Sequence, residues 1–331
     1  MQNQQTHTHL QETQPLVTFI VTCYNLPVAM LCECIDSILA LSLSPAEREI
    51  IVVDDGSESS PMNGLMPYGT DIIYVRQKNQ GLSVARNTGI NMATAKYIQF
   101  VDGDDYLIKK PYEHCLDILK NEKDIDMVVF DFTSNTANQT TYDDLPMMSG
   151  TEYMRTRNIH GTAWGYLFRR ITLSELRFTP GIWHEDEEFT PQLLIRAEHI
   201  VVTNAKAYYY NKRPGTITTH DDYESKQKRL NDFSGVIDRL CYLADRVPQN
   251  DRLALQRRIA QLTMAYIYQV IIQLRSRQAL NDCLDSLRNR GLFPLPDRDY
   301  TKKYQWFRRM SNSKLGLSVL VNLLPLMKKE R

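Results

Sequence analysis

Two aspartates separated by a glycine, Asp102-Gly103-Asp104, come directly after the apolar run at residues 97–101. A short apolar run bounded by polar residues is typical of a buried strand, and a glycine lets backbone and ligand approach each other closely. Carboxylate oxygens suit Mg²⁺ and Mn²⁺, and Mg²⁺ usually takes one or two of them beside phosphate oxygens and water. Asp and Gly are also common in surface turns. The motif therefore indicates a divalent-metal site or a plain turn, and its place after a strand favours the metal site.

A second acidic group, at residues 185–188, has four consecutive carboxylates. A carboxylate can act as a general base, which takes the proton from a hydroxyl group while that hydroxyl attacks. Acidic residues also favour the first turn of a helix, because the helix dipole stabilises negative charge there. The two interpretations are compatible, and the residues alone do not select one carboxylate as the base.

The elements that would position these groups can be read from the hydrophobic pattern. Strands are predicted at residues 16–22, 49–53, 71–76 and 97–101, with helices between them up to about Leu41 and at 82–95. Continuous apolar strands that alternate with helices predict a mostly parallel, Rossmann-like α/β sheet sandwiched by helices. Ligands of such sheets bind beyond the carboxyl ends of the strands. We therefore expect one crevice formed by residues 22–25, 54–57 and 102–105.

The rest of the chain has a different pattern. Residues 134–148 are polar and turn-rich, which favours a loop, and residues 208–210 read as an aromatic strand. From about Tyr223 onward the pattern is helical, most clearly at 253–274. We expect a disordered segment at residues 1–14, an α/β domain at 15–220, and a helical C-terminal domain at 221–331 that ends in a basic and apolar tail.

Several blocks of this sequence resemble the motifs of family 2 glycosyltransferases, which have the GT-A fold. In family order they resemble the opening strand and loop, the uracil-side motif, the helix-opening signature, the metal motif, the E-D-x-x-F catalytic segment and the Y-Y-R-x-R-x-G-S-I ending. The blocks lie at residues 15–25, 51–57, 79–89, 102–105, 184–189 and 208–217. The chain departs from the usual pattern at Thr22-Cys23, where many relatives have a proline, and at Asn211 and Thr216, where Arg and Ser are commoner.

For the donor, the resemblance implies a nucleoside-diphosphate sugar, with uridine as the base and Mn²⁺ or Mg²⁺ on the diphosphate. Asp55 would accept a hydrogen bond from a base N–H. Arg86 would brace the nucleotide, although an ion-paired surface arginine is the alternative. Asp102 would face the ribose or sugar and share the metal site with Asp104. The other expected donor-site residues are Thr22, Cys23, Tyr24, Asn25, Asp54 and Gly103.

For the reaction, the resemblance selects Asp186 as the general base, with Glu185 beside it in the site. Direct attack opposite the diphosphate inverts the anomeric carbon, and one carboxylate suffices because the metal stabilises the leaving group. Arg213 would bind the diphosphate bidentately. His220 is either a metal ligand or, as we prefer, an exposed loop residue. Trp164 is either a platform for the acceptor sugar or a core residue.

These expectations describe an inverting, metal-dependent hexosyl- or N-acetylhexosaminyltransferase. Its acceptor would be a hydroxyl group in bacterial polysaccharide, capsule or lipid-linked glycan biosynthesis. A catalytically inactive nucleotide-sugar or glycan-binding module of the same fold is the alternative, and the intact Asp102, Asp104 and Asp186 argue against it. A nicotinamide dehydrogenase would need G-x-G-x-x-G after the first strand, where this chain has no glycine. A sugar nucleotidyltransferase would normally open with a glycine-rich loop and a basic residue, which are also missing.

The composition fits an ordinary globular chain, since 331 residues with 43% hydrophobic and 24% charged content can bury a full core. The six cysteines have no paired C-x-x-C spacing, which indicates a reducing compartment. The first fourteen residues are polar and do not resemble a signal peptide. We therefore expect a cytoplasmic location and no nucleic-acid partner.

The C-terminal tail is strongly basic. Residues 302–331 have eight Lys or Arg and one acidic residue, which gives 8 − 1 = +7 in a chain whose formal net charge is zero. The apolar run at 315–327 is too short to cross a bilayer, because a crossing helix needs roughly twenty residues. The tail is expected to be either a terminal helix packed in the core or a peripheral anchor on anionic lipid at the inner face of the plasma membrane.

Overall fold

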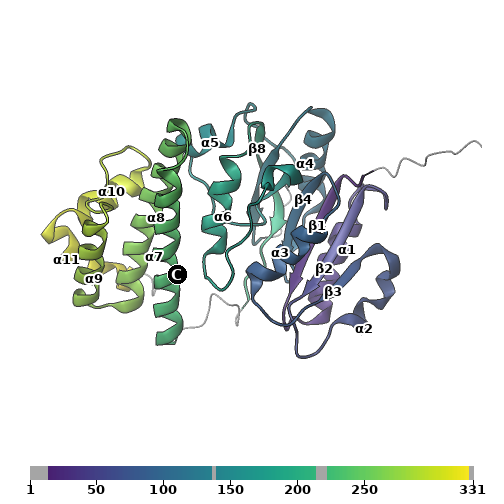
Figure 1. Cartoon of the computed structure of the whole chain (residues 1–331), viewed down its shortest axis with the longest axis horizontal. Helices are drawn as coiled ribbons and strands as arrows, with labels where there is room; N and C mark the ends of the chain where they lie inside the picture. The colour runs from purple at the N-terminus through teal and green to yellow at the C-terminus, as the bar shows by residue number, and fades with distance from the viewer. Residues whose placement is uncertain (1–13, 136–138, 214–221, 328–331) are drawn as a thin grey trace, which may run out of the picture.

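The computed structural model of the chain describes residues 14–135, 139–213 and 222–327 (Figure 1). The first part of the chain forms one eight-stranded sheet with the order β3-β2-β1-β4-β7-β6-β8-β5. The strands are β1 (Val17–Cys23), β2 (Arg48–Asp54), β3 (Ile73–Arg76), β4 (Tyr97–Asp102), β5 (Tyr106–Leu107), β6 (Met127–Thr133), β7 (Tyr166–Arg169) and β8 (Ile200–Tyr209).

The sheet is mixed but mostly parallel. β1 pairs in parallel with β2 and β4, β2 with β3, and β6 with β8. β7 is antiparallel to β4 and β6, and β5 is antiparallel to β8. The helices and helical turns around the sheet are α1 (Val28–Leu39), α2 (Met62–Leu65), η1 (Met66–Asp71), α3 (Leu82–Met92), α4 (Lys109–Asn121), α5 (Gly150–Thr156), η2 (Arg170–Leu173) and α6 (Glu185–Leu194). The predicted α/β fold class is confirmed.

Both faces of the central strand β1 are buried. Phe19 and Val21 pack in one hydrophobic cluster with residues of α1 and α4. Ile20, which points to the opposite face, packs in a second cluster with residues of α3 and α6. Because neither face meets water, the strand reads as a continuous apolar run.

The carboxyl ends of β1, β2 and β4 lie side by side. Thr22 of β1 stands opposite Asp102 of β4, and Cys23 stands opposite Asp54 of β2. The predicted convergence of three polar segments at one edge of the sheet is confirmed.

The C-terminal part is helical. It comprises α7 (Tyr223–Ala244), α8 (Gln249–Leu274), α9 (Arg277–Asn289), α10 (Lys302–Ser311) and α11 (Lys314–Met327). Residues of α7 and α8, such as Ile237 and Leu255, belong to the same hydrophobic cluster as Ile20 of the sheet. Figure 1 shows α9, α10 and α11 at the end of the molecule farther from β1, β2 and β3. The core therefore continues from the sheet into the first two C-terminal helices.

The tail forms α11, and part of it is buried. Leu320 and Leu324 lie in a hydrophobic cluster with residues of α8, α9 and α10, as the core-packing alternative expects. Leu315, at the start of the same helix, is 83% exposed. Within the described ranges, no helix is both long and apolar enough to cross a membrane.

Candidate active site

The Asp102-Gly103-Asp104 turn is fixed against the end of β1. The backbone N–H of Gly103 donates to the carbonyl oxygen of Thr22 at 3.0 Å. A Cβ atom at position 103 would stand 2.8 Å from that same oxygen, so any other residue would displace the turn. The glycine thus allows two carboxylates to follow a buried strand directly.

Arg86, on α3, connects the two acidic groups found in the sequence. Its side chain is buried, and it donates to Asp102 Oδ1 at 2.9 Å and to Glu185 Oε1 at 2.7 Å. Its guanidinium also lies over the ring of Phe178, 5.3 Å from the ring centre. Burial alone would lower the pKa of Arg86, but Asp102 and Glu185 raise it above its ordinary value, so the cation is held. Arg86 is the buried, bridging residue and not a surface arginine.

The two aspartates after β2 are also buried. Asp54 accepts hydrogen bonds from the backbone of Ser57 at 2.8 Å and from the Tyr74 hydroxyl at 2.8 Å. Asp55 accepts from the Gln77 side chain at 2.7 Å and from the backbone of residues 80 and 81 at 3.0 and 2.7 Å. Asp55 therefore orders the loop that leads into α3.

The segment after β1 turns sharply beside these aspartates. Thr22 and Cys23 are buried, and burial, then Asp54 and Asp55, raises the pKa of the Cys23 thiol to about 12. Tyr24 is 45% exposed. Asn25 has a positive φ of 49°, and its backbone N–H donates to Ser57 Oγ at 2.9 Å. Tyr24 and Asn25 are thus the exposed residues of this segment, and Thr22 and Cys23 lie beneath the surface.

The two later aspartates of the β4 turn have different partners. Asp104 accepts from Arg213 Nε at 2.8 Å. Asp105 accepts from the Tyr208 hydroxyl at 2.7 Å and from the backbone N–H of Asn211 at 2.8 Å, and burial, then Asp102, raises its pKa to about 8. The end of β8 is thereby bound to the turn. Residues 214–221, including Thr216 and His220, lie outside the described residues.

The turn offers a divalent cation two carboxylates. Asp102 is largely buried, with 26% of its side chain exposed, and Asp104 is 18% exposed. Across the residues that the structure describes, no group of three or more His, Cys, Asp and Glu side chains comes together as a metal cage. Two carboxylates fit an ion that completes its coordination with phosphate oxygens and water. Binding such an ion through Asp104 would compete with the Arg213 contact.

The second acidic group opens helix α6, and three of its four carboxylates have arginine partners from three other elements. Glu185 pairs with Arg86 of α3. Glu187 pairs with Arg258 of α8, and Glu188 with Arg239 of α7. Among the described residues Asp186 has no ion-pair partner.

Asp186 is therefore the one carboxylate of this group that forms no ion pair within the described part of the chain. Its Oδ1 accepts the backbone N–H of Glu187 at 2.8 Å. Burial raises its pKa well above the ordinary value, Glu185 and Glu187 raise it further, and Arg86 opposes the shift. A carboxylate with a raised pKa is a stronger base than a solvent-exposed one.

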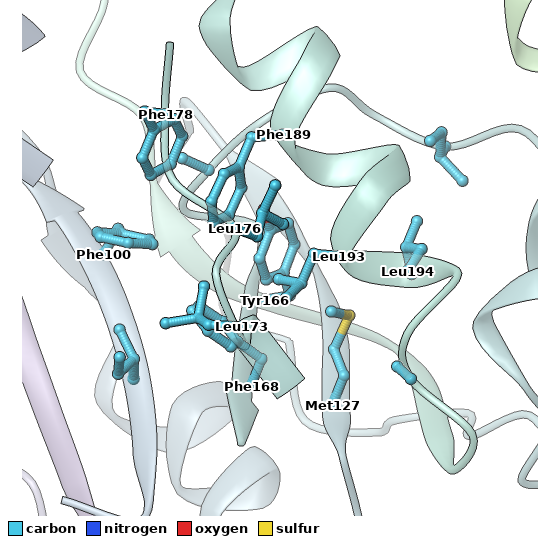
Figure 2. Packing of buried hydrophobic residues seen from close by; sticks show 14 of the residues in the cluster. Phe100, Met127, Tyr166, Phe168, Leu173, Leu176, Phe178, Phe189, Leu193 and Leu194 are labelled. Atoms are coloured by element: carbon cyan, nitrogen blue, oxygen red, sulfur yellow. The ribbon is translucent and has the colours of Figure 1, made fainter. Parts of the chain in front are cut away.

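An aromatic cluster holds the start of α6 against the sheet. Phe189 stacks on Phe178 with ring centres 3.8 Å apart, and Phe100 of β4 packs edge-on against Phe178 at 5.4 Å (Figure 2). Phe178 is also the ring beneath Arg86. The same packing thus positions both the arginine and the helix that begins with the carboxylates.

Trp164 is 8% exposed and stacks on Tyr208, with ring centres 4.3 Å apart. It belongs to a hydrophobic cluster, as the core interpretation expects. Its neighbour Phe132, 5.0 Å away edge-on, is 37% exposed and also contacts His160. Phe132 is thus an accessible ring in this region, and the sequence did not point to it.

Arg239, Arg258 and Tyr208 also belong to the site's framework, and the sequence alone did not indicate this. Both arginines lie in strongly helical segments where a solvated charge is the ordinary expectation. Only the four adjacent acidic residues at 185–188 were a signal that cations had to be nearby.

Comparison with known proteins gives a consistent result. Residues 18–173 match the family described as "Glycosyl transferase family 2". The chain is 30% identical over 222 residues to glycosyltransferase GlyA of Streptococcus pneumoniae. The matched region covers 61% of this chain and 31% of that protein. The chain is 31% identical to the uncharacterized glycosyltransferase EpsJ of Bacillus subtilis, over 62% of this chain and 63% of that protein. The chain thus spans less than two thirds of the length of these relatives.

Two kinds of solved structure share its fold. Residues 1–349 of TarS from S. aureus, crystallised with UDP-GlcNAc, superpose with a TM-score of 0.58 at 16% identity, over 83% of this chain and 92% of that one. The mannosyltransferase PcManGT from Pyrobaculum calidifontis, in complex with GDP-Man and Mn²⁺, gives 0.56 at 15% identity, over 96% and 89%. At these identities the likeness concerns the fold alone.

Proposed function

We propose that this chain, which belongs to glycosyl transferase family 2, transfers a sugar from a nucleoside diphosphate to a hydroxyl acceptor with inversion. The observation that carries the proposal is the position of Arg86. It contacts Asp102 at the end of β4 and Glu185 at the start of α6. The turn suited to a metal-bound diphosphate and the carboxylate suited to a base, Asp186, are thus kept next to one another.

The nucleoside would lie beyond β1 and β2, next to the buried residues Thr22, Cys23 and Asp54 and beside the exposed Asn25. Tyr24 is exposed enough to stack on a base. Asp55 accepts three hydrogen bonds from its own chain. A carboxylate has about four lone-pair sites, so one site is left for a base N–H. This supports uracil as the base, and the donor as a UDP-hexose or UDP-N-acetylhexosamine.

Asp104 and Asp102 would hold a Mn²⁺ or Mg²⁺ ion, which when bound stabilises the negative charge of the departing diphosphate. Arg213 pairs with Asp104. We infer that it turns from Asp104 to the diphosphate once the donor arrives, because a guanidinium can bind phosphate oxygens through two parallel hydrogen bonds. Arg86 would keep Asp102 ionised and correctly oriented.

Asp186 would accept the proton of the acceptor hydroxyl while its oxygen attacks the anomeric carbon. The surroundings of Asp186 support this role: its Oδ1 accepts one backbone N–H, and no arginine among the described residues forms an ion pair with it. A cation on the base would stabilise the carboxylate and weaken its affinity for the proton.

For the acceptor we propose a sugar unit of a bacterial surface polysaccharide or of its lipid-linked precursor. A sugar ring could stack on the exposed face of Phe132, supported from behind by Trp164. The competing proposal, an inactive binding module, makes the opposite prediction for donor turnover. An active transferase should release nucleoside diphosphate slowly from a UDP-sugar even without an acceptor.

The test compares two variants for nucleotide binding and for turnover. Asp104→Ala should lose the dependence of UDP affinity on Mn²⁺ and should not turn over donor. Asp186→Asn keeps the shape of the side chain but removes the proton acceptor, so it should retain Mn²⁺-dependent UDP affinity and lower transfer by roughly 10²–10⁴-fold. Full activity in excess chelator would contradict the metal role. Near wild-type transfer by Asp186→Asn, with loss in Glu185→Gln or Glu187→Gln, would show that the base is misassigned.

A further inference from the structure

Two of the carboxylates that open α6, Glu187 and Glu188, pair with arginines from the C-terminal helices. Arg239 on α7 donates to both oxygens of Glu188, at 2.8 and 3.0 Å. Arg258 on α8 pairs with Glu187. These are contacts between the C-terminal helices and the segment that includes Asp186, made at sequence separations of 51 and 71 residues.

Arg258 binds two segments at once. Its Nη1 donates to the carbonyl oxygen of Ile159 at 3.1 Å, while its Nη2 donates to Glu187 Oε2. A Cβ atom at Gly161 would overlap the Glu187 carboxylate, so the loop that follows Ile159 passes directly over it. Glu187 is therefore held between this loop and Arg258, with little freedom to move.

The position of Glu187 is coupled to that of Asp186. The backbone N–H of Glu187 is the group that donates to Asp186 Oδ1, at 2.8 Å. A shift of the Glu187 backbone would turn the Asp186 carboxylate away from its present direction. Without Arg258, the largely buried Glu187 would also lack a counter-charge. A buried carboxylate without a counter-charge is unfavourable, so Glu187 would move toward water.

We propose that Arg258, assisted by Arg239, is a positioning residue for the transfer reaction: the C-terminal helices fix the first turn of α6 so that Asp186 faces the acceptor and stays unpaired. This inference rests on the proposed function, because it takes Asp186 as the general base. It assigns the C-terminal helices a part in the chemistry without any contact to donor or acceptor. A role limited to stability would not require charged partners, since a buried ion pair can often be replaced by apolar residues without loss.

The test uses the neighbouring Arg257 as a matched control. Arg257 and Arg258 are adjacent on α8 and are 8% and 7% exposed. Each donates to a backbone carbonyl oxygen, Arg257 to that of Arg155 in α5 and Arg258 to that of Ile159 in the loop that follows α5. Of these two arginines, only Arg258 pairs with a carboxylate of α6 among the described contacts. Both are changed to Gln in the full chain, and kcat for transfer, KM for the donor and Kd for UDP with Mn²⁺ are measured.

We expect Arg258→Gln to lower kcat by roughly 10²-fold, the loss that a misplacement of about 1 Å can cause. KM for the donor and Kd for UDP should stay near the wild-type values. Arg257→Gln should keep kcat, and Arg258→Lys should recover part of the loss because the charge remains. The Arg239 side chain is 39% exposed, so this position tolerates change. Arg239→Gln should lower kcat to a smaller degree, and it is the test variant if Arg258→Gln does not fold.

Two results would overturn the proposal: wild-type kcat in Arg258→Gln and Arg239→Gln, or an equal loss of kcat in Arg257→Gln. Asp186→Asn is measured in parallel to separate this proposal from the function on which it rests. If Asp186→Asn is active, Asp186 is not the general base, and the proposed function is contradicted on that point. An inactive Asp186→Asn variant beside a fully active Arg258→Gln variant removes only the positioning role.

Discussion

At the scale of single residues, the site depends on which carboxylates are neutralised. Arg86 pairs with Asp102 and Glu185, and Arg213 pairs with Asp104, whereas no residue that the structure describes forms an ion pair with Asp186. The family resemblance selected Asp186 among four adjacent acidic residues before its surroundings were known. The structure adds a physical distinction, because the three neighbours of Asp186 are each paired with an arginine.

The raised pKa of Asp186 predicts the acid limb of the pH–rate profile. Burial is the largest cause, Glu185 and Glu187 add to it, and Arg86 opposes it, while the Tyr166 hydroxyl lies close enough to interact with the charge. A base works only when deprotonated, so transfer should be fast above the raised pKa and should fall as pH drops through it. We expect this fall well above pH ~3.9, the value for a free aspartate.

The measurement is kcat/KM for transfer as a function of pH, with UDP binding followed over the same range. Glu187→Gln serves as the comparison, because removing that negative charge should move the acid limb to lower pH. An acid limb in the ordinary carboxylate range, or one that stays in place in Glu187→Gln, would contradict the predicted effect of the surroundings on Asp186.

At the scale of elements, the sequence was most informative where hydrophobic runs were continuous. The strands around residues 16–22, 49–53, 71–76 and 97–101 are confirmed with shifts of one or two residues at their ends. β8 was expected only at its aromatic end. It begins at Ile200, and Asn204 and Lys206 interrupt its apolar pattern. β5, β6 and β7 were not predicted as strands. β5 and β7 have two and four residues, and runs this short carry little periodic signal. β6 has seven residues in a largely apolar run, so its pattern is that of a strand and the omission has no physical reason.

The framework of the site was harder to predict than its polar residues. The positions of Asp102 and Asp55 after predicted strands were enough to predict that they lie at the same edge of the sheet, because the carboxyl ends of parallel strands meet there. The pairing of Glu187 with Arg258 joins residues 71 positions apart. Such a contact depends on how helices pack against the sheet, and no local pattern in the sequence encodes it.

A packing prediction follows for α3, the helix that carries Arg86. A Cβ atom at Gly89 would overlap Cγ2 of Ile20 on β1. In an exposed helix, Gly→Ala stabilises by about 1 kcal/mol. Here we expect Gly89→Ala to lower the free energy of unfolding by about 1–3 kcal/mol, as overpacking does. Denaturant unfolding measures the change.

The control for Gly89→Ala is Gly235→Ala on α7, where an added Cβ would meet only the end of the Arg239 side chain at 3.1 Å. That variant should be neutral or slightly stabilising. In the double variant Ile20→Ala with Gly89→Ala, the space left by Ile20 should accept the new methyl group. The double variant should therefore lose less than the sum of the two single changes, and simple additivity would refute the steric explanation.

At the scale of the whole molecule, the chain has a continuous core from the sheet into α7 and α8. A separate cluster joins Leu230 of α7 to residues of α8, α9, α10 and α11. α8 takes part in both. This arrangement is consistent with Arg258 as a positioning residue, because a helix packed on both sides holds its side chains in place. The division into domains at residues 220 and 221, which lies at the edge of the undescribed segment 214–221, stays a prediction.

The last prediction concerns the basic tail, which we propose binds anionic membrane surfaces. Removing residues 312–331 would also remove Leu320 and Leu324 from the core. A loss of membrane binding in that deletion could then not be separated from a loss of stability. Substitutions on the surface avoid the problem. Leu315 is 83% exposed at the start of α11, and Trp306 on α10 is 50% exposed. The basic residues Lys302, Lys303, Arg309 and Lys314 of the same two helices are also exposed.

We expect Leu315→Glu, and separately Lys302→Gln with Lys303→Gln, to weaken binding to vesicles that contain phosphatidylserine. Each lysine near an anionic surface contributes about 1 kcal/mol, so each loss should weaken partitioning about fivefold at low salt. Ile171→Glu is the matched control, because Ile171 is 80% exposed but lies on η2, in the α/β part of the chain. Vesicle sedimentation measures binding, and UDP affinity should be unchanged in all variants. Equal binding by Leu315→Glu and the wild type, or equal binding to neutral and anionic vesicles, would leave α11 as a core helix without a membrane role.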